Sequence, residues 1–112
     1  MDERAGPDRA PVDFTVEERE DSTVVFVRGD LDATGAPALR AQLVATMESA
    51  PRRVVLDLSG VDFVDSLGLS MLVAAHRRAD ELGIELHLAA LSPATRRVLE
   101  ITRLTDLFTI VE

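Results

Sequence analysis

The chain alternates between short apolar runs and stretches in which apolar residues recur at helical spacing. Apolar and polar residues alternate from Val12 to Val16, and residues 23–28 form a second run that is rich in β-branched side chains. An apolar period of two is typical of strands with one buried face. Because only the polar turn Glu20-Asp21-Ser22 separates the two runs, we expect them to pair as an antiparallel hairpin.

Three later segments show helical spacing. The first is predicted to begin at Thr34 as its N-cap, with Pro37 tolerated in the first turn, and to end near Pro51. The second runs from Ser66 to a glycine at position 83, a residue typical of the end of a helix. The third begins at Ser92, which is followed by a proline that fits the first helical position.

Apolar runs separate the predicted helices. Residues 54–58 are almost unbroken in their apolar character and are bounded by Arg52-Arg53 and Ser59-Gly60, so they predict a central strand with both faces covered. Residues 84–88 and 108–111 predict two more strands. The order of elements is β-β-α-β-α-β-α-β. Strands joined by crossover helices lie parallel, so we expect an α/β fold with a mixed β-sheet packed with helices.

One local feature conflicts with this pattern at the end of the third helix. A left-handed residue that ends a helix is usually glycine, but the sequence has Arg103 at that position. An arginine there would cost about 1 kcal/mol relative to glycine.

Composition and charge limit the possible classes of protein. The 112 residues, 46% of them hydrophobic, predict one domain over residues 12–112, preceded by a charged, Gly- and Pro-containing tail over residues 1–11 that we expect to be disordered. The chain has no cysteine, no apolar leader and no apolar run of about 20 residues, which favours a soluble cytoplasmic protein. Its net charge of −8 argues against binding to nucleic acid or to an anionic membrane.

The stretch VDFVDSLGLS at residues 61–70 places a serine at the expected start of the second helix. The commonest reason for serine there is N-capping, so Ser66 is an N-cap candidate. Asp65, Ser66 and His76 also supply the residue types of a hydrolase triad. Ser66 and His76, however, are separated by roughly 15 Å on one helix, which excludes a shared hydrogen bond. We therefore predict no catalytic residue.

Metal and cofactor chemistry also lack candidate ligands. The two histidines, His76 and His87, stand without cysteines or a spaced carboxylate cluster, and we interpret both as ordinary surface or rim residues. The glycines match no nucleotide-binding fingerprint. The acid-rich loop 29–32 fits two roles equally well, capping of the following helix or contact with a partner.

Three separated stretches together resemble the STAS family, in particular the bacterial anti-sigma factor antagonists. They are Gly29-Asp30-Leu31-Asp32, Phe63-Val64-Asp65-Ser66-Leu67-Gly68-Leu69 and Leu91-Ser92-Pro93-Ala94. They occur in the family's order, and the likeness covers about residues 12–112. The Asp-Ser-x-Gly stretch is the most specific of the three.

This resemblance implies a regulatory protein that is not an enzyme. It implies that Ser66 is phosphorylated by an anti-sigma factor that is also a serine kinase, with a phosphatase to reset the site, and that Asp32 lies near Ser66. The residues expected to contact the partner are Asp32, Asp65, Leu67, Gly68 and Leu69. Family members often have Ser, Thr or Ala where this chain has Leu67, so this position bears on which kinase recognises the site. The alternative is a STAS scaffold or ligand-sensing module in a stress-signalling assembly, without phosphorylation.

Overall fold

The structure, a computed structural model, describes residues 11–111. The elements follow the predicted order: β1 (Asp13–Glu18), β2 (Thr23–Leu31), α1 (Gly35–Glu48), β3 (Arg53–Val64), α2 (Ser66–Leu82), β4 (Glu85–Ala89), α3 (Pro93–Ile101) and β5 (Thr109–Val111). The prediction of a disordered tail over residues 1–11 falls on residues that, except for Pro11, lie outside the described part of the chain.

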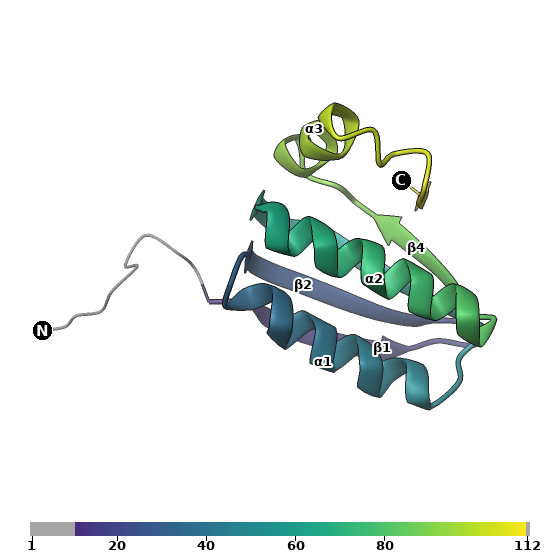
Figure 1. Ribbon diagram of the computed structural model, residues 1–112. Helices are drawn as coiled ribbons and strands as arrows, with labels where there is room; N and C mark the ends of the chain where they lie inside the picture. Colours follow the sequence, from purple (N-terminus) through teal and green to yellow (C-terminus); the bar gives the residue numbers. More distant parts are fainter. Residues whose placement is uncertain (1–10, 112) are drawn as a thin grey trace, which may run out of the picture.

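The strands form one mixed sheet in the order β1-β2-β3-β4-β5. β1 and β2 pair antiparallel, with Phe14 opposite Val27 and Val16 opposite Val25, which confirms the predicted hairpin. β2, β3, β4 and β5 pair parallel to one another. Because α1 follows β2 and α2 follows β3, the two helices begin at the same edge of the sheet and run side by side (Figure 1).

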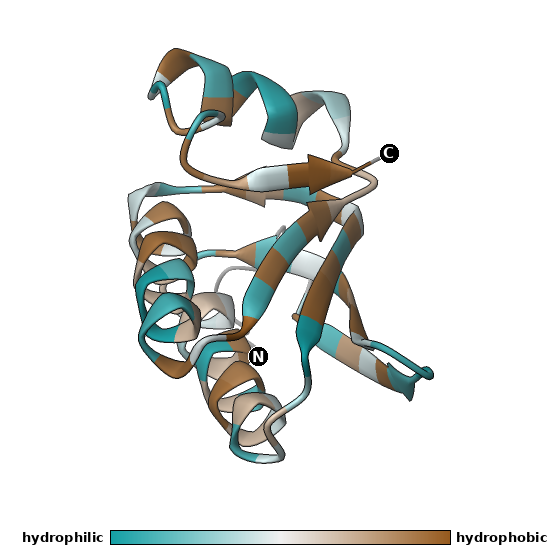
Figure 2. Ribbon diagram, turned by 90° about the vertical axis from the view of Figure 1, so that its right-hand side faces the viewer, coloured by the Kyte–Doolittle hydropathy of each residue, from teal (hydrophilic) through white to brown (hydrophobic). Residues whose placement is uncertain are grey.

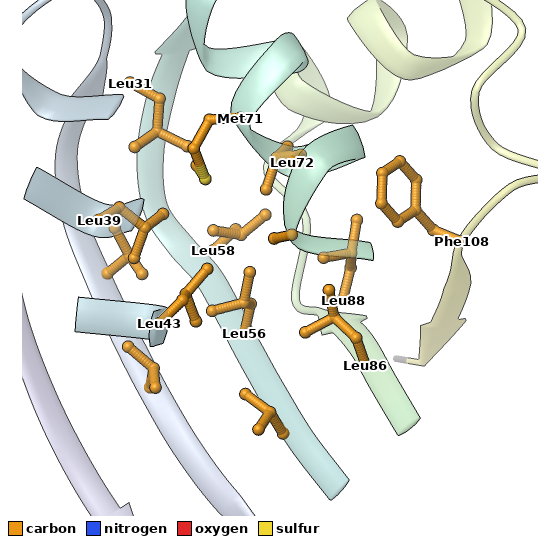
Figure 3. Packing of buried hydrophobic residues seen from close by; sticks show 14 of the residues in the cluster. Leu31, Leu39, Leu43, Leu56, Leu58, Met71, Leu72, Leu86, Leu88 and Phe108 are labelled. Atoms are coloured by element: carbon orange, nitrogen blue, oxygen red, sulfur yellow. The ribbon is translucent and has the colours of Figure 1, made fainter. Parts of the chain in front are cut away.

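The hydrophobic core lies between the sheet and the pair of helices α1 and α2. These helices stand together on one side of the sheet in both ribbon views (Figures 1 and 2). Figure 3 shows the middle of the core, where leucines from α1, α2, β3 and β4 meet: Leu39, Leu43, Leu56, Leu58, Leu72 and Leu88. Each of these side chains is at most 2% exposed, so burial of apolar surface holds the two helices in place.

β3 is longer than predicted. The expected strand ended at Leu58, but β3 continues to Val64. The pairing with β2 is irregular around Arg28, which lies opposite Gly60, and a Cβ on Gly60 would lie 2.6 Å from Arg28 Cγ. Gly60 is therefore a close-approach position within a distorted strand, although next to Ser59 it resembles a turn.

Hydrogen bonds fix both ends of α3. The Ser92 hydroxyl accepts a hydrogen bond from the Thr95 N–H at 3.2 Å and donates one to the Val61 carbonyl at 2.7 Å, which confirms the predicted start and ties α3 to β3. At the other end Arg103 does adopt the left-handed conformation, with φ of 62°. The Leu104 N–H donates to the Leu99 carbonyl at 2.8 Å, as in a Schellman motif, and this bond helps to hold the strained residue.

Of the helices within residues 11–111, none is both long enough and apolar enough to cross a membrane.

Candidate functional site

The first turn of α2 is organised by Asp65. β3 ends at Val64, and Asp65 takes an extended conformation as the N-cap residue. Its Oδ1 accepts hydrogen bonds from the backbone N–H of Leu67 at 2.9 Å and of Gly68 at 3.0 Å. Ser66, which the sequence offered as an N-cap candidate, therefore does not cap this helix. The carboxylate of the preceding residue reaches the same donors, and Ser66 becomes the first helical residue.

The hydroxyl of Ser66 is left available by this arrangement. Ser66 is exposed, and within the described residues its side chain makes no hydrogen bond to the protein. The hydroxyl therefore has no structural role in the helix start and faces solvent at the edge of the sheet.

The start of α1 uses the same device. Asp32 Oδ1 accepts from the N–H of Thr34 at 3.0 Å and from that of Gly35 at 2.8 Å, whereas Thr34 occupies the N-cap position without a capping bond from its own side chain. Asp32 is only 7% exposed, so these hydrogen bonds at the start of α1 are shielded from solvent. Of the two roles open for the loop 29–32, capping of the following helix is confirmed for Asp32.

The two helix starts are joined through the end of β2. The Asp65 N–H donates to the Leu31 carbonyl at 3.1 Å. A Cβ on Gly68 would lie 2.5 Å from that same oxygen and 2.9 Å from Val64 Cγ1, so only glycine lets α2 approach this closely. Since Leu31 precedes Asp32 and Asp65 precedes Ser66, this contact brings Asp32 and Ser66 to one edge of the sheet.

The residues predicted to contact a partner divide between surface and interior. Leu67 is 53% exposed, and Asp65 is half-buried. Leu69 is half-buried against the core, and Gly68 is buried, like Asp32. Phe63 was not among the residues predicted to contact a partner. It precedes Asp65 by two residues, and its aromatic side chain is 39% exposed. Phe63 was missed because the strand was predicted to end at Leu58. In the longer β3, Phe63 lies between the exposed Asp62 and the buried Val64, close to the start of α2 in the chain.

The histidines take structural positions. The ring of His76 packs edge-to-face on Phe108, with a centroid distance of 5.6 Å. His87 Nε2 lies 3.5 Å from Glu85 Oε1, and the His87 side chain is 17% exposed. Within residues 11–111 no group of three or more His, Cys, Asp or Glu side chains is placed to hold a metal ion.

Two carboxylates in ion pairs between strands have shifted pKa values. Arg28 on β2 pairs with Asp13 on β1, and this hydrogen bond and charge lower the pKa of Asp13. Arg53 on β3 lies 3.0 Å from Glu85 on β4 and lowers the pKa of Glu85 in the same way. Both pairs are exposed, and the Arg53–Glu85 pair lies at the N-terminal ends of β3 and β4, whereas Ser66 follows the C-terminal end of β3.

Residues 13–112 match the family model of the STAS domain, and the chain therefore belongs to the STAS domain family. This confirms the resemblance found in the sequence.

Two of the proteins to which this chain is similar are anti-sigma factor antagonists. The anti-sigma-B factor antagonist of Listeria monocytogenes is 32% identical over 100 residues, which cover 88% of each chain. The crystal structure of an anti-sigma factor antagonist from Mycobacterium paratuberculosis superimposes with a TM-score of 0.81 at 33% identity, over 96% of this chain and 89% of that one.

SpoIIAA shares the fold at lower identity. Its unphosphorylated form matches with a TM-score of 0.73 over 89% of both chains. The phosphorylated form of this Bacillus cell fate determinant matches with a TM-score of 0.68 over 89% of this chain and 92% of that one. Both are 20% identical to this chain, so they show a common fold.

Proposed function

We propose that this protein is an anti-sigma factor antagonist whose binding is controlled by phosphorylation of Ser66. In the unphosphorylated form it binds an anti-sigma factor that is also a serine kinase, and so frees a sigma factor. The partner then phosphorylates Ser66 and releases the domain, and a phosphatase resets it. The observation that supports this most directly is the exposed Ser66 hydroxyl, which Asp65 relieves of any capping role.

The surface around Ser66 suits a protein partner. Leu67 directly follows Ser66 in the chain and Phe63 precedes Asp65 by two residues, and both are exposed apolar side chains. Exposed aromatic and aliphatic side chains of this kind commonly anchor interfaces. Asp32 and Gly68 are buried, and in this proposal they position the first turn of α2 and touch the partner little.

A phosphate on Ser66 would change the charge of this surface. Phosphorylation adds about −1.5 to −2 charges, next to Asp65 and near Asp62. Two unit charges about 6 Å apart repel by roughly 2.8 kcal/mol at an effective dielectric of about 20. The dipole at the helix N-terminus stabilises an exposed anion by only about 0.3–1 kcal/mol, which is less than this repulsion.

A partner that buries this pair would make the repulsion worse, because it removes screening water. Each 1.4 kcal/mol changes the affinity about tenfold, so one phosphate is enough to release the partner without refolding the domain. The relatives are consistent with this proposal, since SpoIIAA has been solved in both phosphorylated and unphosphorylated forms.

The decisive experiment is phosphorylation by anti-sigma factors with a kinase domain encoded in the same genome. The protein is incubated with each of them and ATP, and its intact mass is measured. We expect a gain of one phosphate in the wild type and in Ser49→Ala, which removes an exposed serine side chain at the opposite end of α1, and no gain in Ser66→Ala. No gain with any of the kinases would favour the scaffold alternative, and a gain that persists in Ser66→Ala would refute Ser66 as the phosphorylation site.

Calorimetry then tests the release step. Ser66→Asp and Ser66→Asn have side chains of nearly the same size and differ in charge. We expect Ser66→Asp to bind the anti-sigma factor at least about tenfold more weakly than Ser66→Asn, as the repulsion above requires. Equal affinities of the two variants would contradict an electrostatic release.

A further inference from the structure

A groove runs along the outer surface between α1 and α2 and begins beside Ser66. Its first part, of about 750 Å³, is lined on one side by Leu67, Ser70 and Met71, in the turns of α2 that follow Ser66. A second part continues toward the other end of the helices, past Met47 and Ala75. Since Leu67 belongs to the surface proposed to meet the partner, groove and switch form one continuous face.

The groove is lined mainly by small and apolar residues. Ala36 and Pro37 of α1 face Ala74 of α2, so the two helices leave a furrow between them. Val44 and Leu67 line it as larger apolar side chains, 45% and 53% exposed. An apolar partner side chain that entered this furrow would be removed from water together with Val44 and Leu67, which favours binding.

The charge of the groove is opposite to that of the protein. Arg40 lines both parts, and Arg77 and Arg78 line the second. Glu81 is the one acidic side chain among the lining residues, and it is paired with Arg78 at 3.0 Å. The groove thus has a surplus of positive charge in a chain with a net charge of −8.

We infer that the groove receives an acidic amphipathic helix of the anti-sigma factor. This inference rests on the proposed function and names a second contact with the same partner. The apolar stripe of such a helix would lie on the floor, as in other helix-in-groove complexes, and its carboxylates would pair with Arg40 and Arg77. α1 has 14 residues, or about 21 Å, which matches a partner helix of similar length.

Charge complementarity decides between acidic and basic occupants. A basic helix would place its cations against the arginines, and like charges brought together at an interface cost affinity. An acidic helix is repelled by the protein as a whole but attracted at this groove, so the arginines also fix where it docks.

A synthetic peptide tests the groove without the partner. The probe is a 14-residue helix with leucines at the i, i+3, i+4 and i+7 positions and glutamates elsewhere, and its counterpart has lysine in place of glutamate. In an NMR titration of the full chain, we expect the acidic peptide to shift the amide signals of Ala36, Val44, Met71 and Ala74, and the basic peptide to leave them unchanged. Equal shifts with both peptides, or none with either, would overturn the inference.

A charge-reversal pair gives the control. Arg40→Glu is expected to weaken binding of the acidic peptide roughly tenfold, whereas Arg97→Glu changes the net charge equally at an exposed position on α3, outside the groove, and should have little effect. Equal losses in both variants would show that only overall charge matters. Shifts of the groove amides with protein concentration in the absence of peptide would identify a second copy of this chain as the occupant, and would overturn the inference too.

The two proposals can fail separately. The peptide titration needs no kinase and no phosphate, so a positive result stands even if Ser66 is never phosphorylated. Conversely, if Ser66 is phosphorylated and the anti-sigma factor binds wild type and Arg40→Glu equally, the switch stands and the groove inference is wrong.

Discussion

Replacing Gly68 by alanine sets two opposing effects against each other. Alanine is favoured over glycine in a helix by about 1 kcal/mol, so propensity alone predicts stabilisation. However, the new Cβ would lie 2.5 Å from the Leu31 carbonyl oxygen, a backbone atom that cannot rotate away. Overpacking of this kind typically costs about 1–3 kcal/mol. Because the clashing atom belongs to the backbone, the cost lies in the upper part of this range, about 2–3 kcal/mol. After the gain in helix propensity is subtracted, we expect Gly68→Ala to lower the free energy of unfolding by about 1–2 kcal/mol.

Gly83 supplies the matched control at the other end of α2. It has φ of 71°, and a Cβ there would meet nothing within 4 Å. Gly83→Ala should therefore lose about 1 kcal/mol through backbone strain alone. Because Gly83 is far from Leu31, this variant should leave the amide signals of Leu31 and Asp65 unchanged, whereas Gly68→Ala should shift both as α2 moves away from β2.

The assay is urea unfolding followed by far-UV circular dichroism, since the chain has neither Trp nor Tyr for fluorescence. A loss of about 1–2 kcal/mol lowers the urea midpoint by roughly 0.5–1 M for a slope of about 2 kcal/mol/M. A higher midpoint for Gly68→Ala than for wild type would mean that helix propensity wins, and that α2 does not rest on Leu31 as described.

Three further predictions concern the cap, the core and the ion pairs. Asp65→Ala should cost about 1 kcal/mol in urea unfolding and Ser66→Ala almost nothing, and the reverse order would restore Ser66 as the cap. Leu72→Ala, at a fully buried site, should cost about 2–5 kcal/mol by the same assay, and a loss below about 1 kcal/mol would contradict the packing. Arg53 lowers the pKa of Glu85, so their ion pair stabilises the fold at pH values above the ordinary pKa of a glutamate. This stabilisation is lost as the pH falls through the lowered pKa. The difference in urea midpoint between wild type and Glu85→Gln should therefore narrow below about pH 4.3, and a constant difference would contradict this linkage.

The order of elements could be predicted because each one has a local signal. Alternation in β1, the apolar run of β3 and the Ser92-Pro93 start of α3 each identify their element from a few residues. The C-terminal end of β3 was harder to predict, because Ser59-Gly60 resembles a turn in the sequence. Only the pairing with Arg28 shows that this glycine lies inside a strand.

The hydrogen bonding at the start of α2 could not be predicted from the sequence. Serine and aspartate are both good N-caps, so the sequence Asp65-Ser66 leaves the capping residue open. The end of β3 at Val64 decides it, because it places Asp65 at the position that precedes the helix. The burial of Asp32 and Gly68 likewise depends on how closely α2 approaches Leu31, which is a tertiary contact without a local signal.

The capping of α2 by Asp65 has a consequence for how such regulation can evolve. Since the fold does not need the hydroxyl at position 66, that position is free to change without a penalty in stability. Under the switch proposed above, a descendant with alanine there would fold equally well and bind its partner permanently, and one with aspartate would fold and stay released. In that proposal a lineage acquires, loses or fixes the control by substituting a single residue, while the neighbouring aspartate keeps the domain intact.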